Sequence, residues 1–288
     1  MNRLSNPSYT AEVIKKYEFH FQKRFGQNFL VDANILKKIC EAADIGKEDL
    51  VIEIGPGIGS LTQCLAEEAG LVLAIEIDKK LIPILEETLS GCGNVELINE
   101  DVLKTDLAKL IGQYGEGRRI KLVANLPYYI TTPIIMGILE KRLPIESITI
   151  MIQKEVAQRM QAEPGSKDYG ALSLAVQYYA KTRLITVVPP GCFMPKPKVA
   201  SAVIRLDLDP KPRIRAKDEE FLFRLIRASF QKRRKTLQNA LSNSLEIRKK
   251  KESIAAAIAE LGLDAAIRGE KLSLSEFVAL SDLLMSKE

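Results

Sequence analysis

Short apolar runs alternate with amphipathic stretches between residues 30 and 208. The runs are rich in valine, isoleucine and leucine, and they predict strands at Leu50–Ile54, Leu71–Ile77, Val95–Asn99, Lys121–Ala124 and Ser147–Ile152. Helical periodicity predicts helices between them, at Leu61–Ala69, Lys79–Leu89 and Pro133–Leu139. Continuous apolar strands separated by helices are typical of a parallel sheet that is covered on both faces.

Two further apolar runs, Arg183–Val188 and Ala200–Leu208, predict strands separated by a proline-rich loop over residues 189–198. That loop has too few backbone donors to form a central strand. Because no helix lies between these two strands, we expect them to pair antiparallel at one edge of the sheet. Seven mostly parallel strands that end in this way predict a Rossmann-like α/β fold of the class I methyltransferase type, not of the dehydrogenase type.

The pattern after residue 210 is helical, with helices predicted at Glu219–Phe230, Leu237–Leu245, Ser253–Leu261 and Ser275–Met285. We therefore expect a catalytic domain over residues 1–210 and a small all-α domain over residues 211–288, joined near Asp209–Pro212. Residues 1–17 lack the apolar core of a signal peptide, and we expect them to form a frayed, exposed lead-in.

The number and spacing of the cysteines and histidines limit the metal sites and disulfides that the chain can form. Cys40, Cys64, Cys92 and Cys192 are scattered without a Cys-x-x-Cys pair, and His20 is the sole histidine. We expect no metal site and no disulfide framework, a surface position for His20, and reduced, partly buried cysteines in a cytoplasmic protein.

The positive charge is concentrated near the C-terminal end. The net charge is +5, and residues 191–288 hold 20 lysines and arginines against 13 aspartates and glutamates. The other residues hold 22 against 24. This imbalance favours a polyanionic partner for the C-terminal third, although proteins that bind no nucleic acid show similar excesses.

A glycine-rich turn, Glu53-Ile54-Gly55-Pro56-Gly57-Ile58-Gly59, follows the first predicted strand and precedes a helix. Its Gly-x-Gly-x-Gly spacing differs from the Gly-x-Gly-x-x-Gly of dinucleotide sites. Glu76 lies 21 residues after Gly55, where a carboxylate accepts hydrogen bonds from ribose hydroxyls. Asp101 ends the third strand and is placed to accept a hydrogen bond from an adenine amine.

Glu53, Glu76 and Asp101 lie at the ends of three successive strands, so they are expected to line one crevice at the carboxyl edge of the sheet. S-adenosylmethionine fits this pattern. It has a ribose and an adenine, it lacks a pyrophosphate, and its sulfonium suits a negatively charged wall. The alternative for each acid taken alone is a helix cap or a solvated side chain.

A second motif, Asn125-Leu126-Pro127-Tyr128, follows the fourth predicted strand. A polar side chain, a proline-fixed turn and an aromatic ring at a strand end can hold a base by its exocyclic amine. We expect the Asn125 side-chain oxygen and the Leu126 carbonyl to accept the two amine hydrogens. Tyr128 would stack on the flipped base and Phe193 would close its other side. The alternative for either ring is a core or rim aromatic.

A series of motifs in family order resembles the ribosomal RNA adenine N6-dimethyltransferase family, in its KsgA/RsmA small-subunit branch. They are Lys23–Leu30, which contains the Gly-Gln-Asn-Phe-Leu signature, Glu53–Gly59, Ile75–Asp78, Asp101-Val102, Asn125–Ile130 with Phe193–Val199, and Phe230–Leu237. The resemblance implies transfer of two methyl groups from S-adenosylmethionine to each of two adjacent adenosines in the 3′-terminal hairpin of 16S rRNA, late in small-subunit assembly. The cofactor site then comprises Gln27, Asn28, Leu30, Glu53, Gly55, Gly57, Glu76, Ile77, Asp101, Val102 and Asn125.

The expected partner is 16S rRNA within an immature small subunit, bound by a monomeric protein. Candidate phosphate contacts are Lys23, Arg24, Lys196, Lys198, Lys232, Arg233, Arg234 and Lys235, with a solvated basic helix end as the alternative. Three other functions are weighed: a 23S rRNA adenine methyltransferase of the macrolide-resistance type, a ribosome-assembly factor that mainly binds, and an NAD-dependent oxidoreductase. The glycine spacing disfavours the oxidoreductase.

Overall fold

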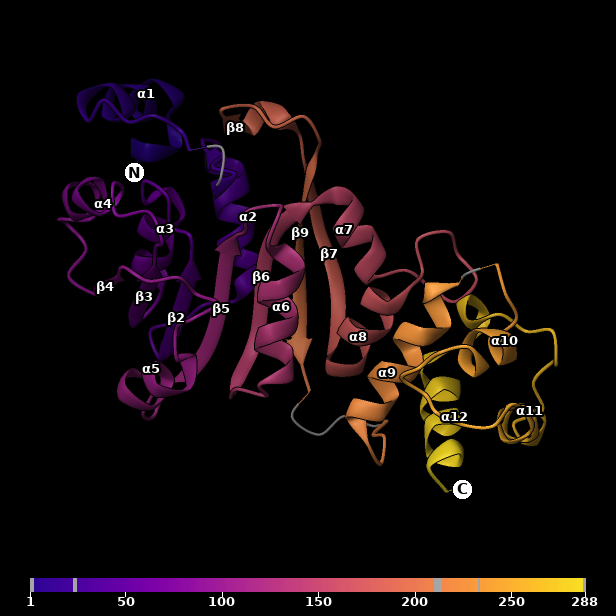
Figure 1. The fold of residues 1–288 in the computed structure, drawn as a ribbon. Coiled ribbons are helices and arrows are strands. Elements are labelled where there is room, and N and C mark those ends of the chain that lie inside the picture. Colours follow the sequence, from indigo (N-terminus) through magenta and orange to yellow (C-terminus); the bar gives the residue numbers. More distant parts are fainter. Residues whose placement is uncertain (1–2, 23–24, 210–213, 233, 287–288) are drawn as a thin grey trace. The chain divides into compact units, whose positions relative to one another are not determined.

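The chain divides by its internal contacts into two units, residues 1–157 with 182–210, and residues 158–181 with 211–288. The computed structural model describes residues 3–22, 25–209, 214–232 and 234–286 (Figure 1). None of the helices in these ranges is long and apolar enough to cross a membrane.

A seven-stranded sheet forms the first unit, in the order β4-β3-β2-β5-β6-β9-β7 (Figure 1). Strands β2 to β6 pair in parallel, and β9 runs antiparallel to β6. The predicted class I methyltransferase-like fold is confirmed. The strands are β2 (Asp49–Ile54), β3 (Leu71–Ile75), β4 (Val95–Ile98), β5 (Arg119–Asn125), β6 (Ile145–Gln153), β7 (Ala180–Val188) and β9 (Ser201–Leu208). A separate two-stranded sheet joins β1 (Phe29–Leu30) to β8 (Phe193–Met194).

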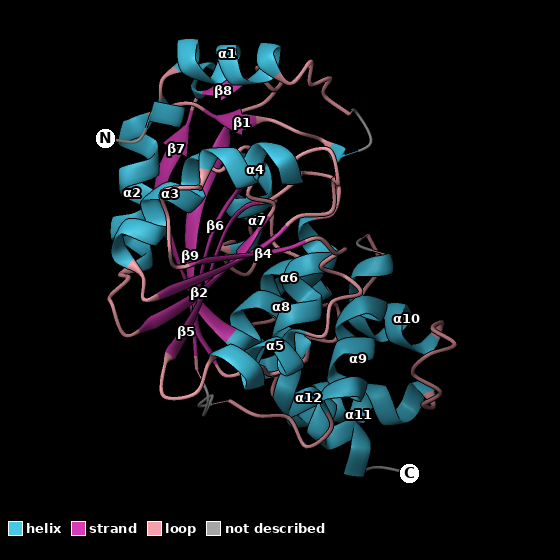
Figure 2. Ribbon diagram, turned by 90° about the vertical axis from the view of Figure 1, so that its left-hand side faces the viewer, coloured by secondary structure: helices cyan, strands magenta, loops and turns pink. Residues whose placement is uncertain are grey.

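Helices cover both faces of the sheet, as the apolar strands require. Figure 2 shows α2 and α3 on one face and α5 and α6 on the other. Alternate strand residues such as Val51, Val72 and Val123 pack with α2 and α3 in one buried cluster. The helices of this unit are α2 (Ala33–Ala43), α3 (Ser60–Glu68), α4 (Ile82–Thr88), α5 (Leu107–Tyr114) and α6 (Thr131–Glu140), with α7 (Lys154–Met160) crossing into the second unit.

The expectation of a frayed N-terminal lead-in is wrong. Residues Pro7–Lys16 form helix α1, and the Asn6 side chain caps it by accepting a hydrogen bond from the Ser8 N–H. Leu4 is fully buried in a second apolar cluster with Phe19 and Phe29. Long-range packing of these scattered apolar residues orders a segment that is polar by local composition.

The second unit is helical, as expected beyond residue 210, and it includes a helix from the middle of the sequence. Its helices are α8 (Ala171–Tyr179), α9 (Glu219–Gln231), α10 (Leu237–Ser242), α11 (Lys251–Glu260) and α12 (Leu274–Ser286). The buried Tyr169 hydroxyl donates to the Leu272 carbonyl at 2.7 Å, which ties residues 158–181 to the C-terminal helices.

The four cysteines are partly buried and His20 is exposed, as predicted.

A buried ion pair lies at the amino ends of β2 and β5. The Lys121 ammonium lies 3.0 Å from the Asp49 carboxylate, and both side chains are fully buried. Asp49 also accepts from Arg119 at 2.8 Å and from the Gly46 N–H at 2.7 Å. Burial by itself raises the pKa of Asp49, but the Gly46 N–H and the Lys121 and Arg119 cations together hold that pKa below its usual value.

Candidate active site

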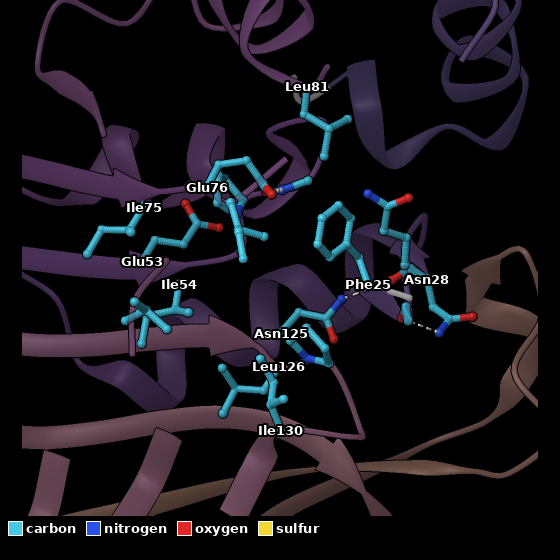
Figure 3. A pocket seen from close by; sticks show the side chains of 18 of the residues that line it. Phe25, Asn28, Glu53, Ile54, Ile75, Glu76, Leu81, Asn125, Leu126 and Ile130 are labelled. Carbon is cyan, nitrogen blue, oxygen red and sulfur yellow. Dashed lines mark hydrogen bonds between the residues drawn. The ribbon is translucent and has the colours of Figure 1, made fainter. Parts of the chain in front are cut away.

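A pocket that is open to solvent lies at the carboxyl ends of β2, β3 and β5 (Figure 3). This is the edge at which open α/β sheets bind their ligands. The loop Phe25–Leu30 forms a further wall. Every residue expected in the cofactor site lines this pocket: Gln27, Asn28, Leu30, Glu53, Gly55, Gly57, Glu76, Ile77, Asp101, Val102 and Asn125.

The glycine-rich turn brings backbone N–H groups against the pocket. Gly57 has a φ of +63°, which side-chain-bearing residues rarely adopt, and its N–H donates to Glu76 Oε2 at 3.3 Å. A Cβ atom at Gly57 would lie 3.0 Å from the Phe29 ring. Glycine is therefore required at this position by both conformation and space.

Two carboxyl groups, Glu53 and Glu76, lie at the same end of the pocket (Figure 3). Burial raises the pKa of Glu53 to about 8. Burial likewise raises the pKa of Glu76 to about 7, although the N–H groups of Asp78 and Gly57 partly offset it. Among the described residues no donor reaches Glu53 Oε2. Buried acceptors of this kind fit a ligand that brings hydroxyl or ammonium donors.

Asp101 both caps a turn and lines the pocket, which are two of the roles that the sequence left open for it. Its Oδ1 accepts from the Leu103 N–H at 3.0 Å, so it caps the turn after β4, and it also lines the pocket. The apolar side chains of Ile77 and Val102 lie in the same lining. A flat ring could rest against these side chains with a carboxylate at its edge.

Two candidate acceptors lie in the Asn125–Tyr128 turn, which lines the pocket. Asn125 Nδ2 donates to the Asn28 carbonyl at 3.0 Å, so the amide oxygen faces away from that bond (Figure 3). The Pro127 carbonyl accepts from Thr131 Oγ1 at 3.0 Å, whereas no donor from the described part of the chain reaches the Leu126 carbonyl. The Asn125 amide oxygen and the Leu126 carbonyl are thus the acceptors left for a ligand.

Tyr128 lines the pocket with its ring held by a hydrogen bond between its hydroxyl and Ser201 Oγ at 2.6 Å. Burial raises the pKa of the Tyr128 hydroxyl. Phe193, expected opposite Tyr128, does not line the pocket. It is 3% exposed and packs in the α2–α3 cluster, because β8 pairs with β1 and places Phe193 opposite Leu30.

Three aromatic residues of the lining, Phe25, Phe29 and Tyr129, had no role assigned from the sequence. Tyr129 is 55% exposed. Each lies inside a motif quoted from the sequence, so membership of that motif was the available signal. Asp78 was also missed as a functional residue, although it ends the Ile75–Asp78 motif. It accepts from both Gln22 and Gln27.

The expected phosphate contacts are spread over the chain. Lys196 and Lys198 are exposed in the loop between β8 and β9, and Lys232, Arg234 and Lys235 are exposed after α9. Lys23, Arg24 and Arg233 lie outside the described residues. The RNA-contact assignments stay predictions.

Comparison with known proteins identifies the family. Residues 18–283 match the family model described as ribosomal RNA adenine dimethylase. The chain belongs to the ribosomal RNA adenine dimethylase family. A relative from Lachnoclostridium phytofermentans, named ribosomal RNA small subunit methyltransferase A, is 58% identical over 100% of this chain and 99% of its own length.

Solved structures agree with that family assignment. A dimethyladenosine transferase from Plasmodium falciparum superposes with a TM-score of 0.76 at 27% identity, covering 88% of this chain and 95% of its own. The 23S rRNA methyltransferase ErmE superposes with a TM-score of 0.68 at 27% identity, covering 90% and 100%. The dimethylase family model thus matches this chain over nearly its whole length, as the motifs predicted.

Proposed function

We propose that this protein transfers methyl groups from S-adenosylmethionine to N6 of two adjacent adenosines in the 3′-terminal hairpin of 16S rRNA during late small-subunit assembly. The observation that carries the proposal is the pair of acceptors, Asn125 Oδ1 and the Leu126 carbonyl, beside a pocket with buried carboxyl groups. The small-subunit name of the full-length relative at 58% identity supports this RNA as the substrate.

The residues of the pocket suit S-adenosylmethionine, which when bound supplies an electrophilic methyl group on a cationic sulfur. Glu76 would accept from the ribose hydroxyls, and Asp101 from the adenine amine. Glu53, fully buried beside them, would accept from a donor of the methionyl end. Ile77 and Val102 would pack on the adenine faces.

The target amine is a weak nucleophile, because its lone pair is delocalised into the ring. Two acceptors that bind its two hydrogens shift N6 toward tetrahedral character and aim the lone pair at the methyl group. The task of the protein is therefore positioning and polarisation. Tyr128, held by Ser201, would stack on the base, and stacking of roughly 1–3 kcal/mol offsets part of the cost of flipping.

After the first transfer N6 keeps one hydrogen, so only one of the two acceptors can bind it. The pocket must then also hold a methyl group where a hydrogen was. Tyr129, which lines the pocket and is 55% exposed, is a side chain that could move to make that room.

Cofactor affinity is expected to rise with pH through neutrality. Glu76 has a pKa of about 7, and the hydroxyl donors bind its carboxylate form, so protonation competes with binding. Since the donors bind the carboxylate form, ionisation of Glu76 should increase the affinity by about tenfold from about pH 6 to about pH 8, and ionisation of Glu53, with a pKa of about 8, should extend the rise further. Calorimetry with S-adenosylhomocysteine measures this. Glu76→Gln should bind more weakly and should lose the part of the rise near pH 7, while the part that Glu53 contributes remains.

Labelled S-adenosylmethionine and ribosomal subunits from cells that lack this activity test the function. We expect label as N6,N6-dimethyladenosine in the small subunit. Label in the large subunit would instead assign the activity of the macrolide-resistance type, which the likeness to ErmE keeps as the second candidate. Absence of label with cofactor bound would favour an assembly-binding role.

The C-terminal helical unit is proposed to contact rRNA phosphates through Lys232, Arg234 and Lys235. These three side chains are exposed and lie within four consecutive positions of the sequence. A cytoplasmic site of action, on an immature small subunit, belongs to the same proposal.

A further inference from the structure

The amide of Asn125 is held in one orientation by a residue 97 positions away in the sequence. Its Nδ2 donates to the Asn28 carbonyl at 3.0 Å (Figure 3). An asparagine amide has a donor end and an acceptor end that occupy almost the same space. If it turned over, it would present N–H groups to the N6 hydrogens and repel them, so the Asn28 carbonyl selects the productive orientation.

The loop that carries Asn28 is itself anchored by side chains. Asn28 Nδ2 donates to the Gly26 carbonyl at 2.9 Å. Gln27 Nε2 donates to Asp78 Oδ2 at 2.8 Å, and Gln27 Oε1 accepts from the Gln22 N–H at 2.9 Å. Both ends of the Gln27 amide are therefore engaged by the protein. Gln27 lines the pocket, but the oxygen and nitrogen of its side-chain amide bind Gln22 and Asp78 and so hold the loop in place.

Asp78 connects this anchor to the cofactor side of the pocket. Its side chain is 3% exposed and accepts from Gln27 and, at 3.0 Å, from Gln22. Its own N–H donates to Glu76 Oε1 at 2.8 Å. A continuous series of contacts thus runs from Glu76 through Asp78 and Gln27 to the Asn28 carbonyl and the Asn125 amide.

We propose that Gln27 is a positioning residue that, through Asp78, couples the cofactor carboxylate Glu76 to the orientation of the Asn125 amide. This inference rests on the proposed function, because it assigns the base to the Asn125 side of the pocket. When ribose hydroxyls bind Glu76, its charged form holds the Asp78 N–H, and the loop Gly26–Asn28 is fixed against the turn that receives the base.

A reciprocal exchange of the two partners tests the coupling. Gln27→Glu removes the donor and places a carboxylate against Asp78. Asp78→Asn leaves one amide oxygen where two carboxylate oxygens accept from Gln27, Gln22 and the Lys80 N–H, so these donors can no longer all be bound. Each single variant is expected to lower kcat at saturating cofactor by about tenfold, since a hydrogen bond to a charged group is lost. In the double variant the new amide can donate to the new carboxylate, so kcat should return to within about threefold of the parent.

Gln63→Glu is the matched control. Gln63 Nε2 donates to the Thr88 carbonyl at 2.8 Å, outside the pocket lining, so the same chemical change breaks a comparable bond elsewhere in the unit. It should reduce thermal stability and leave kcat of the folded protein unchanged. If Gln27→Glu does not fold, Gln27→Ala, which introduces no charge, takes its place with the same expected loss of kcat.

Hydrogen exchange with S-adenosylhomocysteine gives a readout that needs no RNA. The ligand should protect the amides of residues 27–30 and 125–128 in the parent protein. In Gln27→Glu, at ligand concentrations that saturate the site, protection of residues 125–128 should be lost. Equal protection in both proteins, or single-variant losses of kcat that simply add in the double variant, would overturn the coupling. Failure of the parent to methylate small subunits would overturn the proposed function and would leave this exchange test intact.

Discussion

Replacement of Asn125 by alanine is expected to lower kcat for methyl transfer by about 10²–10³-fold at saturating S-adenosylmethionine. The Asn125 oxygen is one of two acceptors left for the base, since its nitrogen is engaged by Asn28. Without the Asn125 oxygen, N6 loses one of the two acceptors that polarise it and hold it in position. The measurement is single-turnover methyl transfer to small subunits, with cofactor affinity determined separately by calorimetry.

Asn125→Asp provides the companion to that variant. It keeps an acceptor oxygen but places a second oxygen against the Asn28 carbonyl, where the parent has a donor. We expect a loss of kcat here too, because the side chain must turn or the loop must move. Near-parental turnover of Asn125→Ala with cofactor saturating would contradict the mechanism, whatever Asn125→Asp does.

The strands and the cofactor pocket were predictable because their signals are local. Apolar runs of strand length mark β2 to β6, and glycine spacing fixes the turn after β2. Parallel strands present their carboxyl ends at one edge, so residues such as Glu53 and Glu76 meet there whatever the details of packing. The position of each acid relative to its strand was therefore enough to place it.

Contacts between distant segments were not predictable in this way. Leu4 is buried against Phe19 and Phe29, and this packing stabilises the segment that contains α1. The sequence of residues 1–17 gives no local signal of these contacts. Phe193 lies within a proline-rich loop and looks available for stacking, yet its pairing opposite Leu30 buries it. The bond from Asn125 to the Asn28 carbonyl joins side chain to backbone, and backbone acceptors carry no residue signature.

Lys121→Met is expected to reduce the free energy of unfolding by about 3–5 kcal/mol. The Lys121 ammonium and the Asp49 carboxylate are both fully buried and 3.0 Å apart, so the change leaves a buried carboxylate without its buried cation. Arg119 and the Gly46 N–H still bind Asp49, which favours the lower end of that range. Urea denaturation at neutral pH measures the loss. Lys121 lies near the start of β5 and Asn125 ends it, so kcat of the folded variant should be unchanged.

The pH dependence of stability provides the sharper check on Lys121→Met. The folded pKa of Asp49 lies below its usual value, so its stabilisation is present above the unfolded pKa of about 3.9 and disappears as pH falls through the folded pKa. The variant should therefore lose less stability than the parent on acidification.

Lys37→Met is the matched control, since Lys37 pairs with Glu41 at 3.7 Å with both side chains mostly exposed. Its effect should stay below about 1 kcal/mol. Equal losses for Lys37→Met and Lys121→Met would show that the buried pair contributes no more than a surface one.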